Sequence, residues 1–297
     1  MQKILVILGP TASGKSDLAV KIAKKYNGEV ISADSRQVYK GLNIGTGKIT
    51  KKEMRGVHHW LLDIVSPKKT FNVADFKKLA AGKIQTILKR HKLPIICGGT
   101  GFYIDSFVKN ISLPEVKPNK KLRKELENKS LEELVKILEK LDKDRLQNID
   151  QKNRVRLIRA IEIANAIGKV PEIKKENSKY HFLQIGLEIP KDEMVARINK
   201  RLEKRIKLGM IEEAENLHKK GLPLERMREL GLEYRFLADY LDKKISKDKL
   251  SEKLKTEIWR YSRRQITWFK RDKNIKWFKP KEFSKINAEV KNFLTGK

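Results

Sequence analysis

A chain of 297 residues is long enough to fold as one large domain, or as a main domain that carries a smaller insertion. Apolar residues make up 39% of it and recur at helix or strand spacing, which excludes a disordered chain. The 68 Lys and Arg residues against 37 Asp and Glu give a net charge of +31, which indicates either a polyanionic partner such as RNA or DNA or a lysine-rich solvated surface.

The first third of the chain alternates short apolar runs with helical patterns. Runs typical of buried strands occupy residues 4–8, 30–32, 61–65 and 93–97. Helical spacing follows the first run and again precedes the last, at residues 14–26 and 74–90. We therefore expect an α/β fold in which helices flank a parallel sheet, with ligands beyond the carboxyl ends of the strands.

Neither a membrane anchor nor a cysteine or histidine metal site is indicated. The run at residues 4–8 is far shorter than the roughly 20 apolar residues that span a bilayer, and no small-residue cleavage site follows it. Cys97, the single cysteine, lies in an apolar run, which predicts a buried thiol and excludes an internal disulfide. The adjacent His58 and His59 lack a third ligand at a recognisable spacing, so we expect both to be structural. These features predict a cytoplasmic protein without membrane contact.

The composition changes at about residue 112, where a segment rich in lysine and proline leads into helical patterns. A strand pattern at residues 182–189 then returns to the sheet, and helical patterns fill most of the chain from there to Phe269. The sequence therefore predicts a core domain with a helical C-terminal part, at residues 1–112 with 183–297, and an inserted all-α domain at residues 113–182.

The motif GPTASGKS matches the P-loop pattern G-x-x-x-x-G-K-S and lies between a predicted strand and a predicted helix. In such a loop, backbone N–H groups and a helix N-terminus converge on phosphate oxygens, the lysine adds charge and the last serine reaches Mg²⁺. We predict a site for a diphosphate, whether of a nucleotide such as ATP or of a prenyl chain, with Ser16 as a ligand of Mg²⁺. Its residues are Gly9, Pro10, Thr11, Ala12, Ser13, Gly14, Lys15 and Ser16.

A carboxylate, Asp34, follows the second predicted strand at the edge of the sheet where ligands bind. It suits a general base, a ligand of Mg²⁺ or, with Ser35, the cap of a helix that begins at Arg36. Arg36, Gln37 and Tyr39 add a guanidinium, an amide and an aromatic ring, a set suited to contact with an unpaired base. The residues by themselves leave these alternatives open.

Several segments together resemble one family, the tRNA dimethylallyltransferases, also called tRNA isopentenyltransferases or IPP transferases. They follow the family's order and cover most of the chain: GPTASGKS, DSRQVYKGLNIGTGK, HHWLLDI, FNVADF, GGTGFY and RRQITWFKR. The resemblance implies transfer of a dimethylallyl group from dimethylallyl diphosphate to N6 of the adenine on the 3′ side of the tRNA anticodon, with release of pyrophosphate. The implied partner is therefore the anticodon loop of tRNA.

The resemblance also implies roles for individual residues. The P-loop would hold the pyrophosphate, Asp34 would be the base for the N6 proton, Thr100 would lie near the transferred group, and Arg201 would reach the pyrophosphate. From the residues alone, Thr100 equally suits a helix N-cap, and Arg201 equally suits a solvated helix face. The implied tRNA contacts are Asp34, Ser35, Arg36, Gln37, Thr100, Arg123, Val155, Arg156, Leu157, Ile158 and Arg159.

Some positions depart from the pattern of this family. Leu232 stands where a tyrosine is expected, and Ile258 and Trp259 replace a threonine and an arginine. Arg263, Arg264 and Gln265 are retained, and we expect them to contact the RNA backbone.

Two other functions are also compatible with the sequence. A P-loop kinase of a small metabolite or nucleoside fits the loop and the acid after the second strand, but it leaves the basic surface unexplained. A non-catalytic or ATP-driven RNA-binding protein fits the charge, but it leaves Asp34 and Thr100 without a role. Arg156 and Arg159, one helical turn apart, suit successive phosphates, although pairing with Glu162 is the ordinary alternative. We expect a monomer.

Overall fold

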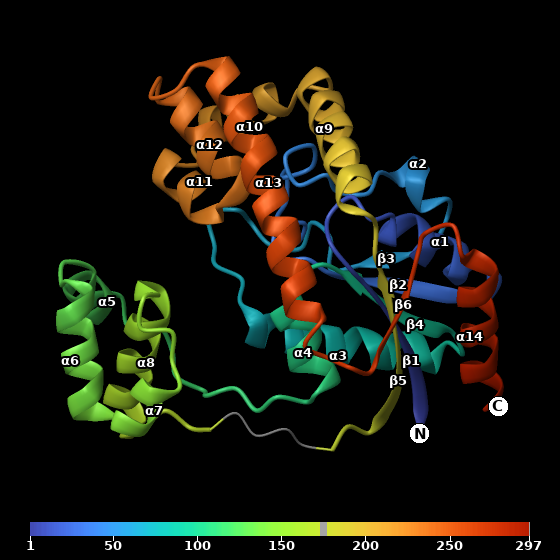
Figure 1. Ribbon diagram of the computed structural model, residues 1–297, viewed down its shortest axis with the longest axis horizontal. Helices are drawn as coiled ribbons and strands as arrows, with labels where there is room; N and C mark the ends of the chain where they lie inside the picture. Colours follow the sequence, from blue (N-terminus) through green and yellow to red (C-terminus); the bar gives the residue numbers. More distant parts are fainter. Residues whose placement is uncertain (173–176, 297) are drawn as a thin grey trace. The chain divides into compact units, whose positions relative to one another are not determined.

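The computed structural model describes residues 1–172 and 177–296. The chain forms two compact units, one comprising Met1–Lys109 with Asn177–Lys297 and the other Asn110–Glu176 (Figure 1). The predicted insertion, residues 113–182, overlaps the second unit but extends into a strand of the first, and its residues 173–176 lie outside the described residues.

A parallel sheet of six strands forms the centre of the first unit, in the order β3-β2-β4-β1-β5-β6. The strands are β1 (Gln2–Leu8), β2 (Gly28–Ala33), β3 (His59–Trp60), β4 (Leu93–Gly98), β5 (Tyr180–Leu187) and β6 (Ile275–Phe278). The apolar run of β1 is fully buried because β1 lies in the middle of the sheet, between β4 and β5. The predicted α/β fold with a parallel P-loop sheet is confirmed.

Helices cover both faces of this sheet. The helices of the first unit are α1 (Lys15–Lys25), α2 (Lys51–Met54), α3 (Val73–Lys89), α4 (Gly101–Val108), α9 (Lys191–Lys207), α10 (Met210–Lys219), α11 (Leu224–Leu230), α12 (Leu232–Leu241), α13 (Lys247–Phe269) and α14 (Phe283–Thr295). Leu5 and Ile7 of β1 pack with α1 and α14, whereas Ile4 and Val6 pack with α3 and α4. Both faces of β1 are therefore apolar, as its sequence requires.

The strand predicted at residues 61–65 is wrong. β3 ends at Trp60, and Leu61 and Asp63 adopt left-handed backbone conformations with φ of 63° and 54°. Leu61 is 2% exposed in the core between the sheet and α3, whereas Ile64 is exposed and Val65 makes only an isolated bridge with Tyr39. The segment turns away from the sheet and lies beside the carboxyl ends of the strands.

Helices α9 to α13 share a hydrophobic core of their own, separate from the two layers on the sheet. That core also contains Ala12 of the P-loop and Val38, Tyr39 and Leu42 of the segment after β2. The helical C-terminal part is therefore packed against the loops at the carboxyl edge of the sheet, where the candidate site lies. In the part of the chain that the structure describes, no helix is both long enough and apolar enough to cross a membrane.

The second unit is all-helical. Its helices are α5 (Lys120–Glu127), α6 (Leu131–Leu141), α7 (Lys143–Gln147) and α8 (Arg154–Ile167) (Figure 1). Leu134, Leu138, Leu157 and Ile161 form the centre of its core, all with 0% exposure. The unit thus buries an apolar centre within its own residues.

Candidate active site

The loop between β1 and α1 has the backbone geometry of a phosphate site. Gly9, Ala12 and Gly14 have φ values of 143°, 62° and 92°, and left-handed residues in such a loop turn neighbouring N–H groups to one side. The helix α1 begins at Lys15, so its N-terminus adds positive potential at the same place. Across the loop, Lys15 Nζ donates to the carbonyl oxygen of Pro10 at 2.5 Å.

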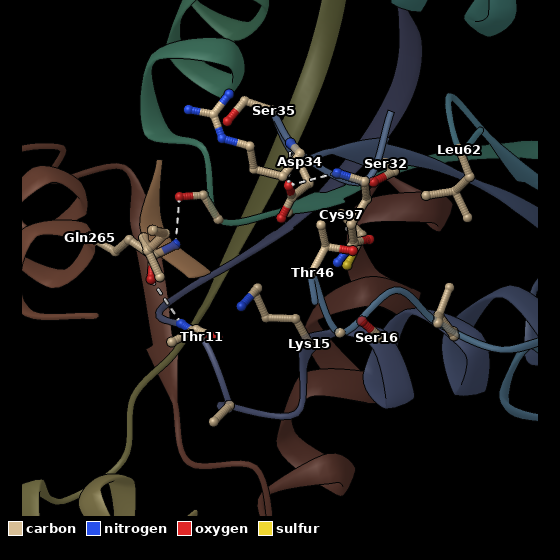
Figure 2. A pocket seen from close by; sticks show the side chains of 18 of the residues that line it. Thr11, Lys15, Ser16, Ser32, Asp34, Ser35, Thr46, Leu62, Cys97 and Gln265 are labelled. Carbon is tan, nitrogen blue, oxygen red and sulfur yellow. Dashed lines mark hydrogen bonds between the residues drawn. The ribbon is translucent and has the colours of Figure 1, made fainter. Parts of the chain in front are cut away.

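A cavity of about 190 Å³ lies at the carboxyl edge of the sheet (Figure 2). Figure 2 shows Thr11, Lys15 and Ser16 of the P-loop on one side of it and Asp34, which follows β2, on the other. The cavity lining also includes several residues that the sequence singled out, namely Ala12, Ser35, Arg36, Gln37 and Arg201. The structure therefore brings the predicted diphosphate site and the predicted base to one space.

A second cavity, of about 350 Å³, adjoins the first. Lys15, Ser16 and Arg201 line both cavities and so stand at their junction. The second cavity adds Arg197 and Lys200 of α9 and also two acids, Asp17 and Glu53. The four cations outnumber the two acids in front of the α1 N-terminus, which suits a diphosphate.

The two cations at the junction are held in a poorly solvated setting. Burial lowers the pKa of Lys15 to about 8, and the nearby Arg201 also lowers it. Desolvation likewise lowers the pKa of Arg201, with Arg205 adding to the effect. Among residues 1–172 and 177–296, no hydrogen bond or ion pair engages the Arg201 guanidinium. Two such cations at one junction favour an anionic ligand, although Asp34 acts on Lys15, and Glu53 and Asp17 act on Arg201, in the opposite direction.

Asp34 shapes a turn with one carboxylate oxygen. Its Oδ1 accepts hydrogen bonds from the backbone N–H groups of Arg36 at 2.8 Å and Gln37 at 3.2 Å. The expectation of a helix that begins at Arg36 is wrong, because residues 35–38 form turns that lead into an isolated bridge at Tyr39. The second oxygen, Oδ2, accepts no hydrogen bond from the described residues, and the side chain lines the cavity.

Thr100 lies behind the wall of the cavity. It occupies the N-cap position of α4, but its hydroxyl makes no capping bond there and instead accepts from the Ser35 N–H at 3.1 Å. Tyr261 of α13 lines the cavity, and the Thr100 hydroxyl acts to lower its pKa. Burial and the nearby Asp34 raise the pKa of Tyr261 to about 12, so its phenol stays protonated. Thr100 is thus bonded to the segment that carries Asp34.

Gln265 of α13 joins two loops of the site. It is 6% exposed; its Oε1 accepts from the Thr11 N–H at 2.8 Å, and its Nε2 donates to the Gly99 carbonyl oxygen at 2.8 Å (Figure 2). Each end of its amide makes one hydrogen bond inside the protein, and its contact with the RNA backbone stays a prediction. Gln265 fixes the P-loop relative to the turn after β4.

A carboxylate that no sequence pattern singled out, Glu213, organises another part of the wall. Glu213 of α10 accepts hydrogen bonds from three consecutive backbone N–H groups, those of Asn43 at 3.0 Å, Ile44 at 2.8 Å and Gly45 at 2.8 Å. Tyr234 donates to the same carboxylate at 2.6 Å, and a Cβ atom at Gly45 would lie 2.5 Å from the Tyr234 hydroxyl. Only glycine fits at that position.

Arg205 of α9 binds the same loop from another direction. Its Nε donates to the Ile44 carbonyl oxygen at 2.7 Å, its Nη2 donates to the Gly45 carbonyl oxygen, and it pairs with Glu233 at 3.0 Å. The loop continues into Thr46, which lines the cavity. Glu213 and Arg205 therefore fix part of the cavity wall by contacts that are distant in sequence. Nothing in the local pattern around either residue signals this role.

Two of the three positions that depart from the family pattern reach the site. Leu232 and Ile258 both line the cavity, whereas Trp259 packs against the core of α9 to α13. The substitutions at Leu232 and Ile258 therefore place aliphatic side chains in the cavity wall.

In the second unit, two predicted tRNA contacts are engaged by an acid. Glu162 is 2% exposed; Arg123 donates to it through Nε at 2.9 Å and Nη2 at 2.7 Å, and Arg159 pairs with it and donates to the Val116 carbonyl oxygen at 2.9 Å. Burial opposes the charge of Glu162, but the hydrogen bonds from Arg123 and Arg159 prevail and lower its pKa to about 2. These arginines hold α5 and α8 together.

The other predicted contacts in α8 differ in exposure. Arg156 is exposed, with its Nη1 4.0 Å from Asp150 Oδ2, and Val155 is 76% exposed. Leu157 and Ile158 are 0% and 7% exposed in the core of the unit, so a side-chain contact of either residue with RNA is corrected to a packing role.

A P-loop and a carboxylate that face each other at the carboxyl edge of a parallel sheet define an α/β enzyme of the P-loop class, which acts on a phosphorylated substrate. The family model described as IPP transferase matches residues 37–272. The chain belongs to the IPP transferase family, which confirms the resemblance seen in its motifs.

Relatives and solved structures agree over the full length. A tRNA dimethylallyltransferase of Acetivibrio thermocellus is 38% identical over 98% of this chain and 96% of that protein, and tRNA dimethylallyltransferase 2 of Treponema denticola is 44% identical over 92% and 94%. The crystal structure of a tRNA isopentenylpyrophosphate transferase from Bacillus halodurans has a TM-score of 0.75 at 35% identity and covers 100% of this chain and 98% of its own. A structure of a eukaryotic dimethylallyltransferase acting on tRNA has a TM-score of 0.84 at 25% identity and covers 100% and 80%.

Proposed function

We propose that the protein transfers a dimethylallyl group from dimethylallyl diphosphate to N6 of the adenine on the 3′ side of the tRNA anticodon, with release of pyrophosphate. The observation that carries the proposal is the single cavity in which Lys15 and Asp34 lie on opposite sides. Membership of the IPP transferase family favours this reaction over a small-molecule kinase and over a non-catalytic RNA-binding protein.

On the donor side, the reaction needs stabilisation of the leaving group. As the allylic C–O bond breaks, its electron pair moves onto the diphosphate, and groups that bind this growing charge accelerate the step. Lys15, Arg201 and the N–H groups at the start of α1 stand together where the P-loop faces the cavity. The unpaired state of Arg201 supports a role in binding the diphosphate.

On the acceptor side, N6 of adenine is a weak nucleophile and must lose a proton as its bond to C1 of the prenyl group forms. Oδ2 of Asp34 is the available acceptor, since Oδ1 is already engaged by the turn. Arg36 and Gln37 line the same side and suit the edges of an unpaired base, and the ring of Tyr261 offers a stacking surface. An adenine of an anticodon loop leaves its stack more easily than a base in a duplex.

We infer Mg²⁺ as the cofactor. The Ser16 hydroxyl, at the start of α1, lines both cavities, and within the described residues no group of three or more His, Cys, Asp and Glu side chains is placed to hold a metal. These residues fit an ion held mainly by donor phosphate oxygens and water, with Ser16 as the protein ligand. Mg²⁺ bound there supplies positive charge to the departing pyrophosphate.

The test is incorporation of radiolabelled dimethylallyl diphosphate into an unmodified tRNA transcript in the presence of Mg²⁺. We expect label in the RNA, none in a transcript with guanine in place of the target adenine, and none after chelation of the metal. Transfer or turnover that requires ATP instead of the prenyl donor would overturn the proposal. We also propose that the protein is a monomer, which light scattering during size-exclusion chromatography checks.

A further inference from the structure

Asp34 is held on both sides by one residue of the turn after β4. The Thr100 N–H donates to the carbonyl oxygen of Ala33 at 3.2 Å, and the Thr100 hydroxyl accepts from the Ser35 N–H at 3.1 Å. Ala33 and Ser35 are the neighbours of Asp34 in the chain. The backbone on either side of the proposed base is therefore bonded to Thr100, and a shift of Thr100 moves the base with it.

Gln265 extends this connection to the P-loop. Its Nε2 donates to the carbonyl oxygen of Gly99, the residue before Thr100, and its Oε1 accepts from the Thr11 N–H, both at 2.8 Å (Figure 2). Gln265 is 6% exposed, and a buried donor or acceptor that loses its partner keeps its desolvation cost. One side chain thus joins the P-loop to the turn that holds Asp34.

The helix that carries Gln265 and the turn after β4 have little room to move separately. A Cβ atom at Gly99 would lie 2.2 Å from Gln265 Nε2, and one at Gly101 would lie 2.3 Å from Cδ1 of Trp268. Trp268 also donates through Nε1 to Asp105 Oδ2 of α4 at 2.9 Å. Gln265 and Trp268 are three residues apart on α13 and so share a face. The helix therefore contacts the turn at two adjacent points.

The bridge connects the two sides of the cavity. Lys15 of the P-loop and Asp34 lie opposite each other, and the donor and the adenine must meet between them (Figure 2). Transfer needs C1 of the prenyl group and N6 of the base at about 3–3.5 Å from each other before the bond forms. We propose that Gln265 is a positioning residue, which acts through Thr11 and Thr100 to set the spacing between the donor diphosphate and the base. This inference rests on the proposed function.

Gln265→Met tests the bridge, because methionine keeps the length of the side chain and removes both hydrogen bonds. The P-loop and the turn after β4 keep their other contacts, so each should still bind its own substrate. Their relative position should change, and we expect the rate of transfer at saturating donor and tRNA to fall by about 10²-fold, the effect of a misplacement of about 1 Å. The half-saturating concentrations of donor and tRNA should change little.

Gln265→Asn separates the length of the bridge from its polarity. Asparagine keeps the amide but is shorter by one methylene, so it cannot reach the Thr11 N–H and the Gly99 carbonyl oxygen together. We expect a loss of rate close to that of Gln265→Met. A wild-type rate in Gln265→Asn would mean that one end of the amide is sufficient, and it would overturn the inference.

Gln184 of β5 supplies the matched control. Its exposed fraction is also 6%, but it is not among the residues that line the cavity. Gln184→Met removes the same kind of buried amide, so it should lower the melting temperature and leave the rate of transfer as in the wild type. Comparison of the variants well below their melting temperatures separates positioning from a general loss of stability.

The measurement is the single-turnover rate of label transfer to tRNA over a range of donor and tRNA concentrations. These rates give the maximal rate and the half-saturating concentration of each substrate. A defect of Gln265→Met in tRNA saturation would assign Gln265 to the RNA, and a defect in donor saturation would assign it to the P-loop alone. Either result overturns the inference, as does a maximal rate equal to that of Gln184→Met.

Amide hydrogen exchange of the free protein tests the bridge without the reaction. Gln265→Met should speed exchange both in the P-loop and in the turn at residues 34–37, whereas Gln184→Met should leave both as in the wild type. Faster exchange in only one of the two loops would overturn the bridge. A wild-type protein that prenylates no tRNA sinks the proposed function instead, and the exchange rates then still decide whether Gln265 joins the two loops.

Discussion

The Asp34 carboxylate has two oxygens with different surroundings. Oδ1 accepts from the N–H groups of Arg36 and Gln37, and this pair of bonds fixes the orientation of the whole group. Oδ2 is left for the cavity. A base held in this way meets its proton donor in a constant geometry, and the turn that holds it carries two more residues of the cavity wall.

Asp34→Asn tests the role of Asp34 as a base separately from its role in holding the turn. Asparagine keeps an oxygen at the position of Oδ1, so the turn should persist, but the side chain no longer accepts a proton. We expect kcat to fall by about 10²–10⁴-fold, the usual contribution of a general base, with little change in tRNA affinity. Single-turnover rates and filter binding measure the two quantities. Asp248→Asn, an exposed change of the same kind on α13, is the control. Equal losses of affinity and rate would assign Asp34 to binding instead.

Lys15 should make donor binding depend on pH. Burial lowers its pKa to about 8, so in the free protein the ammonium group loses its proton as the pH rises through that value, and the diphosphate loses a counter-charge. We expect KM for the donor to be constant below pH 7 and to rise by up to about tenfold per pH unit above pH 8. Saturating donor should restore the rate.

Lys15→Arg is the control for this pH effect, because a guanidinium keeps its charge throughout the range. Its donor KM should be flat between pH 7 and pH 9.5, even where the altered shape weakens binding. A wild-type KM that does not change over the same interval contradicts the low pKa of Lys15.

At the scale of elements, α10 and the loop after β2 act together. Glu213→Gln replaces an acceptor of three N–H groups by an amide that presents hydrogens to the same donors. The loop that carries Thr46 should shift, and we expect kcat/KM to fall by about 10–100-fold, mainly through donor KM. Glu212→Gln, an exposed neighbour on α10, should have no effect. A loss confined to tRNA affinity would mean that the loop serves the RNA and not the donor.

Local sequence patterns predicted some elements of the fold and the site but not others. β1, the P-loop and α1 follow one another directly, so the motif and the apolar period predicted all three. The bonds from Glu213 join residues 168 to 170 positions apart, and the bond from Gln265 to Thr11 spans 254 positions. A helix with an acid on one face looks the same in sequence whether that acid binds a loop or faces water. The strand prediction at residues 61–65 was wrong for a related reason, because an apolar run in the sequence does not show whether its backbone is paired in a sheet.

At the scale of the whole molecule, the net charge of +31 predicted a polyanionic partner but not which cations face it. In the structure, the arginines differ in the groups with which they pair. Arg123 and Arg159 are committed to Glu162, and Arg205 is committed to a loop of the cavity wall. Arg156 projects from the second unit with an acid no nearer than the 4.0 Å contact to Asp150. Of these four arginines, Arg156 is the one with the weakest internal pairing, so it is the best placed to replace counterions on RNA.

Arg156→Ala and Arg159→Ala should therefore change different properties. The first should weaken tRNA binding, and the second should lower the stability of the fold. Without Arg156, tRNA should bind several-fold more weakly, and the slope of log Kd against log salt should fall by about one, with the melting temperature unchanged.

Without Arg159, the buried Glu162 keeps fewer hydrogen-bond partners. The protein should then lose about 1–2 kcal/mol of stability, which is the low end for a charged hydrogen bond because the arginine is partly exposed. Filter binding across a KCl series and thermal unfolding of the whole chain measure both. A salt slope that stays the same in Arg156→Ala excludes a phosphate contact there, and an unchanged melting temperature in Arg159→Ala excludes the structural role of its ion pair.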